Sequence, residues 1–256
     1  MNNMTVPLAG RVAIITGAGQ GIGRVFAKAF ADAGAIPIIA ERNRERADAV
    51  AAEIAGGGGR ARAIATDVAQ MESVAAMAKT VEQEFGRIDI LINNAAIFST
   101  LEMRPFDQIP LSEWDEVLRV NVTGAFLCAR AVVGAMRRAR WGRIINMASG
   151  AVTLGRPNYL HYITSKAALG GMTRSLAREL GPHGITVNAI LPGATFTEIE
   201  RKTVTAEQKT RIIAMQCIAR PEEPQDLVGT ALFLASEASA FLTGQAITVD
   251  GGATHT

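Results

Sequence analysis

Cysteine and aromatic residues are scarce in this chain of 256 residues. Its two cysteines, Cys128 and Cys217, form no CxxC motif, which argues against a disulfide framework and predicts buried or inert thiols in a reducing compartment. Aromatic residues make up 5% of the chain, so the core has to be built from Ala, Val, Ile and Leu. The 25 glycines allow close approach between backbone segments in such a core.

A strong charge of one sign and long apolar runs are also absent. The 26 basic and 24 acidic residues give a net charge of +2, too small to indicate a nucleic-acid or membrane-surface partner. No uninterrupted apolar run reaches the roughly 18 residues of a membrane helix. The N-terminal MNNMTVPLAG lacks the basic region and the long apolar stretch of a signal peptide, so none is expected. No His, Cys and Asp residues have metal-ligand spacing, so a catalytic metal is not expected. We expect a soluble cytoplasmic protein.

Short β-branched segments alternate with helical patterns along the whole chain. The expected strands are 11–16, 36–40, 62–65, 88–92, 143–147, 185–190 and 246–249. The expected helices are 21–33, 43–55, 71–85, 111–136, 159–180 and 224–235. This alternation predicts a Rossmann-type, doubly wound α/β fold: one seven-stranded parallel sheet with helices on both faces, forming a single domain over 1–256. Substrate loops are expected at 97–110 and 193–217.

A glycine-rich stretch, TGAGQGIG, lies between the first expected strand and the first expected helix. Gly17 and Gly21 would close the turn and let the backbone approach a pyrophosphate, and Gly23 would let the helix pack tightly on the strand. The start of the helix supplies unpaired N–H groups and a partial positive charge. A dinucleotide is therefore expected to contact Gly17, Gln20, Gly21, Ile22 and Gly23.

Acidic residues follow the next two strands. Glu41 stands 18 residues after Gly23, where a carboxylate would accept ribose hydroxyls and repel a 2′-phosphate, which favours NAD over NADP. Arg42 is instead suited to that phosphate, so NADP stays open. Asp67 and Val68 are expected beside the adenine, although Asp67 is equally suited to cap the following helix.

Two residues of the sequence YITSK, Tyr162 and Lys166, lie four apart in a helical stretch and therefore share one face. A nearby ammonium favours the phenolate and lowers the pKa of a tyrosine from its usual value of about 10. Ser149 follows the strand 143–147, at the end where a doubly wound fold assembles its site. Asn121 is polar among apolar neighbours and needs partners if it is buried.

Taken together, these patterns resemble the short-chain dehydrogenase/reductase superfamily, in the branch with TGxxxGxG and YxxxK motifs. The resemblance also covers NNAA at 93–96, PGATFT at 192–197 and ITVDGG near the C-terminus. It implies a catalytic tetrad formed by Asn121, Ser149, Tyr162 and Lys166. The reaction that it implies is hydride transfer between a nicotinamide cofactor and a secondary alcohol or ketone.

The resemblance also implies a role for each of these residues. Tyr162 would be the general acid and base, Ser149 would polarise the carbonyl, and Lys166 would lower the pKa of the tyrosine and bind the nicotinamide ribose. Asn121 would hold a water that links Lys166 to solvent, or would bridge structural elements. Cofactor contacts are implied for Asn93, Asn94, Ala95, Pro192, Gly193, Thr195 and Thr197. Ala96 departs from the family, which usually has glycine there.

The substrate pocket is expected between 97–98, 151–154, Tyr159 and 194–217. This lining is mostly apolar and without a fixed cation, which favours a neutral secondary alcohol or ketone as substrate. A 3-oxoacyl-thioester reductase, a sugar dehydrogenase and a catalytically silent dinucleotide-binding sensor or scaffold are the alternatives. His161 is expected to face away, because adjacent helical residues point about 100° apart. The long apolar helices and the resemblance together imply a homotetramer.

Overall fold

A seven-stranded sheet, in which every neighbouring pair of strands is parallel, forms the centre of the computed structural model, which describes residues 8–199 and 205–255. The strand order is β3-β2-β1-β4-β5-β6-β7. Successive strands are therefore added toward one edge of the sheet from β1 to β3 and toward the other edge from β4 to β7, and the order switches between the neighbours β1 and β4. The predicted doubly wound α/β fold is therefore confirmed. The strands are β1 (Val12–Thr16), β2 (Ile36–Glu41), β3 (Arg62–Ala65), β4 (Ile90–Asn93), β5 (Gly142–Met147), β6 (Ile185–Pro192) and β7 (Ala246–Val249).

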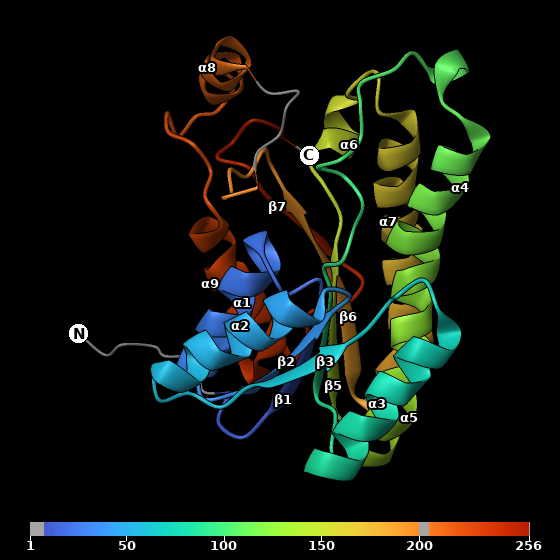
Figure 1. Cartoon of the computed structure of the whole chain (residues 1–256), viewed down its shortest axis with the longest axis vertical. Helices are drawn as coiled ribbons and strands as arrows, with labels where there is room; N and C mark the ends of the chain where they lie inside the picture. Colours follow the sequence, from blue (N-terminus) through green and yellow to red (C-terminus); the bar gives the residue numbers. More distant parts are fainter. Residues whose placement is uncertain (1–7, 200–204, 256) are drawn as a thin grey trace.

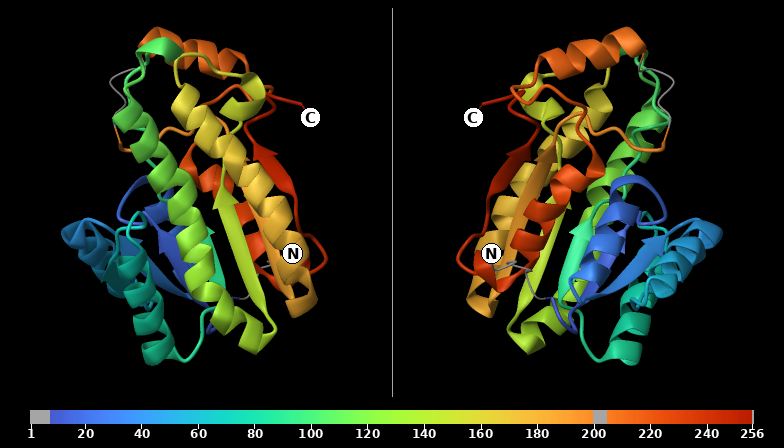
Figure 2. Two further views of the ribbon diagram at one scale, coloured as in Figure 1. Left: turned by 90° about the vertical axis from the view of Figure 1, so that its right-hand side faces the viewer. Right: turned by 90° about the vertical axis from the view of Figure 1, so that its left-hand side faces the viewer.

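Helices cover both faces of the sheet, as the two side views in Figure 2 show. One face carries α1 (Gly21–Asp32), α2 (Arg44–Gly56) and α9 (Pro224–Ala235). The other face carries α3 (Met71–Phe85), α5 (Gly124–Ala139) and α7 (Leu160–Leu180), with α4 (Leu111–Leu118) continuing the line of α5 (Figure 1). The predicted helices hold, with ends that differ by a few residues, except for the one over 111–136.

Alternation along the strands divides the core into two layers, because successive side chains of a strand point to opposite faces. In β1, Ala13 and Ile15 pack with α1, α2 and α9, whereas Val12 and Ile14 pack with α3, α5 and α7. Both cysteines are free: Cys217 is exposed, and Cys128 lies in the second layer, where burial raises its pKa to about 12.

The stretch predicted as one helix over 111–136 is two helices joined by a turn of π-helix, Arg119–Thr123. Contrary to the expectation from the sequence, the whole stretch, Leu111–Ala139, is long and apolar enough to cross a membrane by length and composition alone. In the structure it packs against α3 and α7, in the layer of helices over the sheet. The π turn places Asn121 on the inner side, where it is 2% exposed.

The described residues of both predicted substrate loops lie beyond the carboxyl ends of the strands (Figure 1). The first contains only a short 3-10 turn, Phe106–Gln108. The second contains a helix that periodicity did not reveal, α8 (Ala206–Ala214), which begins with a capping box at Thr205 and Gln208. Residues 200–204 of this loop lie outside the described residues. The short α6 (Ala151–Leu154) follows β5 at the same edge.

Candidate active site

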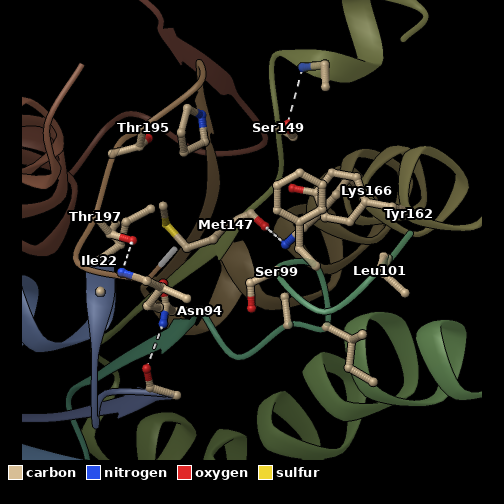
Figure 3. Close-up of a pocket in the computed structure, with 18 of the residues that line it drawn as sticks. Ile22, Asn94, Ser99, Leu101, Met147, Ser149, Tyr162, Lys166, Thr195 and Thr197 are labelled. Atoms are coloured by element: carbon tan, nitrogen blue, oxygen red, sulfur yellow. Dashed lines mark hydrogen bonds between the residues drawn. The ribbon is translucent and has the colours of Figure 1, made fainter. Parts of the chain in front are cut away.

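A cavity of about 1230 Å³ runs along the carboxyl edge of the sheet, from the glycine loop to the start of α7. Of the residues predicted for catalysis or cofactor contact, Gly23, Asn93 and Asn121 do not line it. Those that do are Gly17, Gln20, Gly21, Ile22, Glu41, Arg42, Asp67, Val68, Asn94, Ala95, Ser149, Tyr162, Lys166, Pro192, Gly193, Thr195 and Thr197. Figure 3 shows part of this lining.

The glycine loop has the conformation that a bound phosphate requires. Gly17 and Gly21 have φ values of 63° and 56°, in the left-handed region that favours glycine. A Cβ atom at Gly17 would lie 2.8 Å from the Cα of Ala95, and one at Gly23 would lie 2.4 Å from the carbonyl oxygen of Gly17. The loop and the first turn of α1 therefore form a cradle of main-chain N–H groups that fits a dinucleotide phosphate.

The loop is held from the neighbouring strand β4. Asn94 Nδ2 donates to the carbonyl oxygens of Thr16 (2.9 Å) and Gly17 (3.1 Å), and Ala95 N–H donates to Thr16 Oγ1. Asn93 does not face the cavity, contrary to the implied ribose contact. It is 5% exposed, and its amide donates to Asn146 Oδ1 at 2.8 Å. Alternation along β4 explains this, because Asn93 and Asn94 point in different directions.

The ribose end of the cavity is dominated by charged side chains. Glu41 receives hydrogen bonds from the main-chain N–H groups of Gly19 (3.3 Å) and Asn43 (3.0 Å). Its carboxylate is thus fixed at the end of β2. Arg42 and Arg46 line the same region, and the guanidinium of Arg46 donates to Gln20.

At the adenine end, Asp67 and Val68 line the cavity after β3. Asp67 Oδ1 accepts the Ala69 N–H at 2.9 Å, which closes the turn into α3. The helix-cap alternative is not what the structure shows, because the N-cap position of α3 is Gln70, without a side-chain cap bond.

Lys166 is the best-fixed cation of the cavity. It is 5% exposed, and its Nζ donates to the carbonyl oxygen of Met147, the last residue of β5, at 2.6 Å (Figure 3). Burial lowers its pKa to about 8. Tyr162 lies one turn earlier on α7, and the Lys166 ammonium stands 5.8 Å from the centre of its ring. Ser149 is 6% exposed, and its Oγ accepts the Ala151 N–H at 3.2 Å.

Asn121 acts as a bridge between segments. Its Oδ1 accepts the Ile97 N–H at 2.8 Å, while its Nδ2 donates to the Ile97 carbonyl at 3.2 Å and to Ser165 Oγ at 3.0 Å. The Ser165 hydroxyl in turn donates to the Tyr162 carbonyl at 2.7 Å. The side chain therefore ties the loop after β4 to α7, next to the tyrosine.

Aromatic packing defines the substrate end. Phe98 stacks on the Tyr162 ring at 4.2 Å between centroids and meets the Tyr159 ring at 5.6 Å. Tyr159 is 2% exposed and lies behind Phe98 rather than in the cavity wall, which corrects the prediction. His161 faces away as expected: it is fully buried, with Nε2 at 3.2 Å from Glu113 Oε1.

The expectation of a lining without cations is wrong. Arg156 and Arg211 line the substrate end, together with Glu113 and Glu116. The Arg156 guanidinium lies 5.0 Å from the centre of the Tyr159 ring, and Arg211 pairs with Glu207 at 2.6 Å. Local patterns carried little signal for them, because Arg156 lies in the connection between α6 and α7 and Arg211 lies on α8, which was not predicted.

Opposite the catalytic residues, residues 193–199 form the other wall of the cavity; we call them the cover segment. Thr195 and Thr197 stand on this side in Figure 3. Glu198 Oε1 accepts the Gly21 N–H at 2.8 Å, so a carboxylate occupies a donor of the phosphate cradle. Sequence reasoning missed both this contact and a bond from Thr195 Oγ1 to Glu222 Oε1 of 2.6 Å, because the partners are far apart along the chain.

A phosphate cradle, a carboxylate at the ribose end and a lysine–tyrosine pair beside a serine define a nicotinamide-dependent oxidoreductase. The family model described as Enoyl-(Acyl carrier protein) reductase matches residues 17–254. The chain belongs to the short-chain dehydrogenase/reductase family, whose members use NAD(P) and act on CH–OH or C=O groups.

Curated relatives match over nearly the whole chain. The D-threitol dehydrogenase of Mycolicibacterium smegmatis is 38% identical over 247 residues, which cover 96% of this chain and 94% of the relative. The 3-oxoacyl-[acyl-carrier-protein] reductase of Synechocystis sp. is 40% identical over 248 residues, with 96% and 97% covered. Nicotinamide-dependent hydride transfer is thus common to relatives that differ in substrate.

Solved structures superpose equally well. A short-chain type dehydrogenase/reductase from Mycobacterium marinum gives a TM-score of 0.89 at 38% identity, with 98% of each chain covered. A structure from Beutenbergia cavernae, described as an NAD(P) dependent gluconate 5-dehydrogenase with bound NADP at low occupancy, gives 0.90 at 39% identity, with 97% of this chain and 98% of that chain covered.

Proposed function

We propose that this chain is a single-domain enzyme that interconverts a secondary alcohol and its ketone, with NAD favoured over NADP. The observation that carries the proposal is the buried Lys166, whose ammonium stands beside Tyr162 and next to Ser149 at the end of the cavity away from the phosphate cradle. A charged lysine has no reason to be buried there unless its charge serves the chemistry of the site.

Each catalytic residue then has a distinct task. When bound, the nicotinamide supplies or accepts the hydride. The Tyr162 hydroxyl donates the proton to the substrate oxygen in reduction and removes it in oxidation. Lys166 stabilises the phenolate and binds the nicotinamide ribose, and Ser149 orients the substrate oxygen. Asn121 supports this arrangement through Ile97 and Ser165, and the proposed water relay from Lys166 to solvent is its second task.

The preference for NAD rests on Glu41. Its carboxylate is fixed by the main-chain N–H groups of Gly19 and Asn43 at the ribose end of the cavity. A negative charge held there repels a ribose 2′-phosphate and accepts hydroxyl hydrogen bonds. Arg42 and Arg46 are the groups that would favour NADP. Glu41→Ala is expected to raise the relative use of NADP, measured as the ratio of kcat/KM for the two cofactors.

A second candidate is reduction of 3-oxoacyl thioesters. Arg156 and Arg211 favour it, because cations at the substrate end can hold an anionic carrier or substrate group. The Synechocystis relative is named for this activity. Sugar alcohols and sugar acids form the third class to test, since the neighbouring Glu113 and Glu116 suit hydroxyl groups as hydrogen-bond acceptors.

We also propose that the enzyme is a cytoplasmic homotetramer with no membrane or nucleic-acid partner. Large apolar side chains remain exposed on α5, α7 and the turn before β7: Phe126, Leu160 and Phe241. Burying them between subunits would remove apolar surface from water. Light scattering is expected to give four times the chain mass of 27.0 kDa.

The function is tested by following absorbance at 340 nm with panels of secondary alcohols, ketones, 3-oxoacyl thioesters and sugar alcohols. Each panel is run with both NAD and NADP. Turnover that Tyr162→Phe abolishes supports the proposal. If the wild-type chain binds NADH but converts no compound in any panel, the result would match the silent sensor and contradict the proposed chemistry.

A further inference from the structure

A buried carboxylate lies directly behind the cover segment. Glu222 precedes α9, is 4% exposed, and accepts a hydrogen bond of 2.6 Å from the hydroxyl of Thr195, which is itself 2% exposed. The main-chain carbonyl of Glu222 accepts the Phe196 N–H at 2.8 Å. One residue therefore holds two successive residues of the cover segment, through its side chain and through its main chain.

The second carboxylate oxygen of Glu222 lies against Gly193. A Cβ atom at Gly193 would stand 2.4 Å from this Oε2 and 2.9 Å from the Cβ of Asp250, so a side chain there would displace the carboxylate. The Gly193 N–H lies near Oε2 but donates to the Val249 carbonyl at 2.9 Å, so within residues 8–199 and 205–255 Oε2 feels this main-chain dipole without accepting a well-formed hydrogen bond. The Gly150 N–H, next to Ser149, donates to the Pro192 carbonyl at 2.8 Å. Glu222 thus lies against Gly193, the residue that follows the point where the two walls of the cavity are hydrogen-bonded to each other.

Burial and the neighbouring carboxylates disfavour the ionised form of Glu222. Burial raises its pKa to about 7, and the carboxylates of Asp226 on α9 and Asp250 after β7 act in the same direction. The hydroxyl of Thr195 and the main chain of Gly193 oppose this rise. The neighbouring cation, Arg220, is paired with Asp226 at 2.6 Å.

We infer that Glu222 is a positioning residue for hydride transfer, which through Thr195 and Phe196 sets where the cover segment lies over the nicotinamide. The inference rests on the proposed placement of the nicotinamide between Tyr162 and this segment. A protonated Glu222 satisfies the Thr195 bond without burying a charge. An ionised Glu222 leaves a charge beside Gly193 and two other carboxylates, which loosens the segment.

This geometry predicts a pH dependence of cofactor binding. The carboxyl is protonated below about pH 7 and ionised above it, so affinity falls as the pH rises through that value. If binding required the protonated form alone, affinity would fall by up to about tenfold per pH unit above the pKa.

The test measures NADH binding by fluorescence titration of the full chain between pH 6 and pH 9. Glu222→Gln keeps the shape and the Thr195 bond but cannot ionise, Thr195→Val removes the hydroxyl, and Glu222→Ala removes the support. The matched control is Glu72→Gln, on the exposed side of α3. Melting temperatures show that each variant is folded. The kcat and KM values for the cofactor are measured in parallel once a substrate is in hand.

Glu222→Gln is expected to bind NADH within about twofold of wild type at pH 6 and to lose the decline at higher pH. Glu222→Ala and Thr195→Val are expected to bind at least about threefold more weakly, and to raise KM for the cofactor more than they lower kcat. Parallel pH curves for wild type and Glu222→Gln, or wild-type binding by a folded Glu222→Ala, would overturn the inference. A wild-type chain that binds neither NADH nor NADPH would instead contradict the proposed function.

Discussion

The two walls of the cavity are built in different ways. The catalytic wall, with Ser149, Tyr162 and Lys166, comes from the end of β5 and the first turns of α7, and Lys166 reaches Met147 only 19 residues away. The cover segment, 193–199, is held by Glu222 and by Gly21, the latter 177 residues from Glu198. The first wall is fixed by regular elements, and the second by a few long-range polar contacts.

This difference assigns different tasks to the two walls. Groups that move protons need fixed geometry, which strands and helices provide. A segment that has to admit and release a dinucleotide needs contacts that can break. We therefore expect substitutions in the catalytic wall to change turnover, and substitutions in the cover segment to change cofactor affinity.

The largest effect is expected for Tyr162→Phe. Loss of the hydroxyl removes the general acid and base, so kcat should fall by about 10²–10⁴-fold. The NADH dissociation constant should stay within about twofold, because the stacked ring against Phe98 is kept. Stopped-flow measurement of turnover gives the effect on kcat, and fluorescence titration gives the effect on the NADH dissociation constant. A loss of NADH binding as large as the loss of turnover would erase the distinction between the walls.

Lys166→Met is expected to lower turnover by about 10²-fold, since the phenolate loses its counter-charge. Its effect on stability depends on pH. The lysine has a pKa of about 8 in the fold and 10.5 ordinarily, so the unfolded chain holds more protons between these values. Stability of the wild type therefore rises as the pH goes from 8 to 10.5, and the burial penalty is full below 8.

Thermal melts from pH 6 to pH 10.5 check this. The melting temperature of the variant, relative to wild type, should be highest at pH 6 to 8 and should decline above pH 8. A difference that does not change with pH would mean that Lys166 is not buried as a charge.

Asn121→Ala tests the frame behind the catalytic wall. It leaves the Ile97 N–H and carbonyl without their side-chain partner. The free energy of unfolding, measured in urea, should therefore fall by about 2–3 kcal/mol. Ser165→Ala removes one contact of the same bridge and should cost about 1 kcal/mol. An equal loss in the free energy of unfolding for Asn121→Ala and Ser165→Ala would contradict the bridging role of Asn121.

The smallest effect is expected for Glu198→Gln in the cover segment. The carboxylate holds the Gly21 N–H that a phosphate needs, so removing its charge should strengthen NADH binding by about threefold, or roughly 0.7 kcal/mol. The difference in NADH affinity between Glu198→Gln and wild type should become smaller in high salt, which screens the charge of Glu198. Glu72→Gln serves again as the control. Weaker NADH binding by the variant would show that Glu198 assists the cofactor rather than competing with it.

The same contrast explains how far the sequence could be interpreted. Strands β1 to β7 and the pair Tyr162–Lys166 follow from period and spacing, which are local properties. The turn of π-helix at Asn121 was not predictable, because the contact that accompanies it is made with Ile97, in a loop 24 residues away along the chain. Helix α8 also escaped, since it is short and none of its described residues is buried.

Side-chain direction was the other source of error. Asn93 was expected at the cofactor but lies in a buried network with Asn146, because the pleat of β4 turns it away. The cations Arg156 and Arg211 were not expected in the pocket, because their positions depend on how the loops fold back over the sheet. The partnership of Thr195 with Glu222 leaves no trace in spacing or composition.

The central claim is that Tyr162 transfers the substrate proton while a nicotinamide bound along the cavity exchanges the hydride. The most direct test is a single-turnover reaction of the enzyme with NADH and a ketone that it reduces, followed at 340 nm for wild type and Tyr162→Phe. The account predicts a rapid loss of absorbance in wild type and, at equal NADH occupancy, almost none in the variant. A variant that oxidises bound NADH at the wild-type rate would contradict the account.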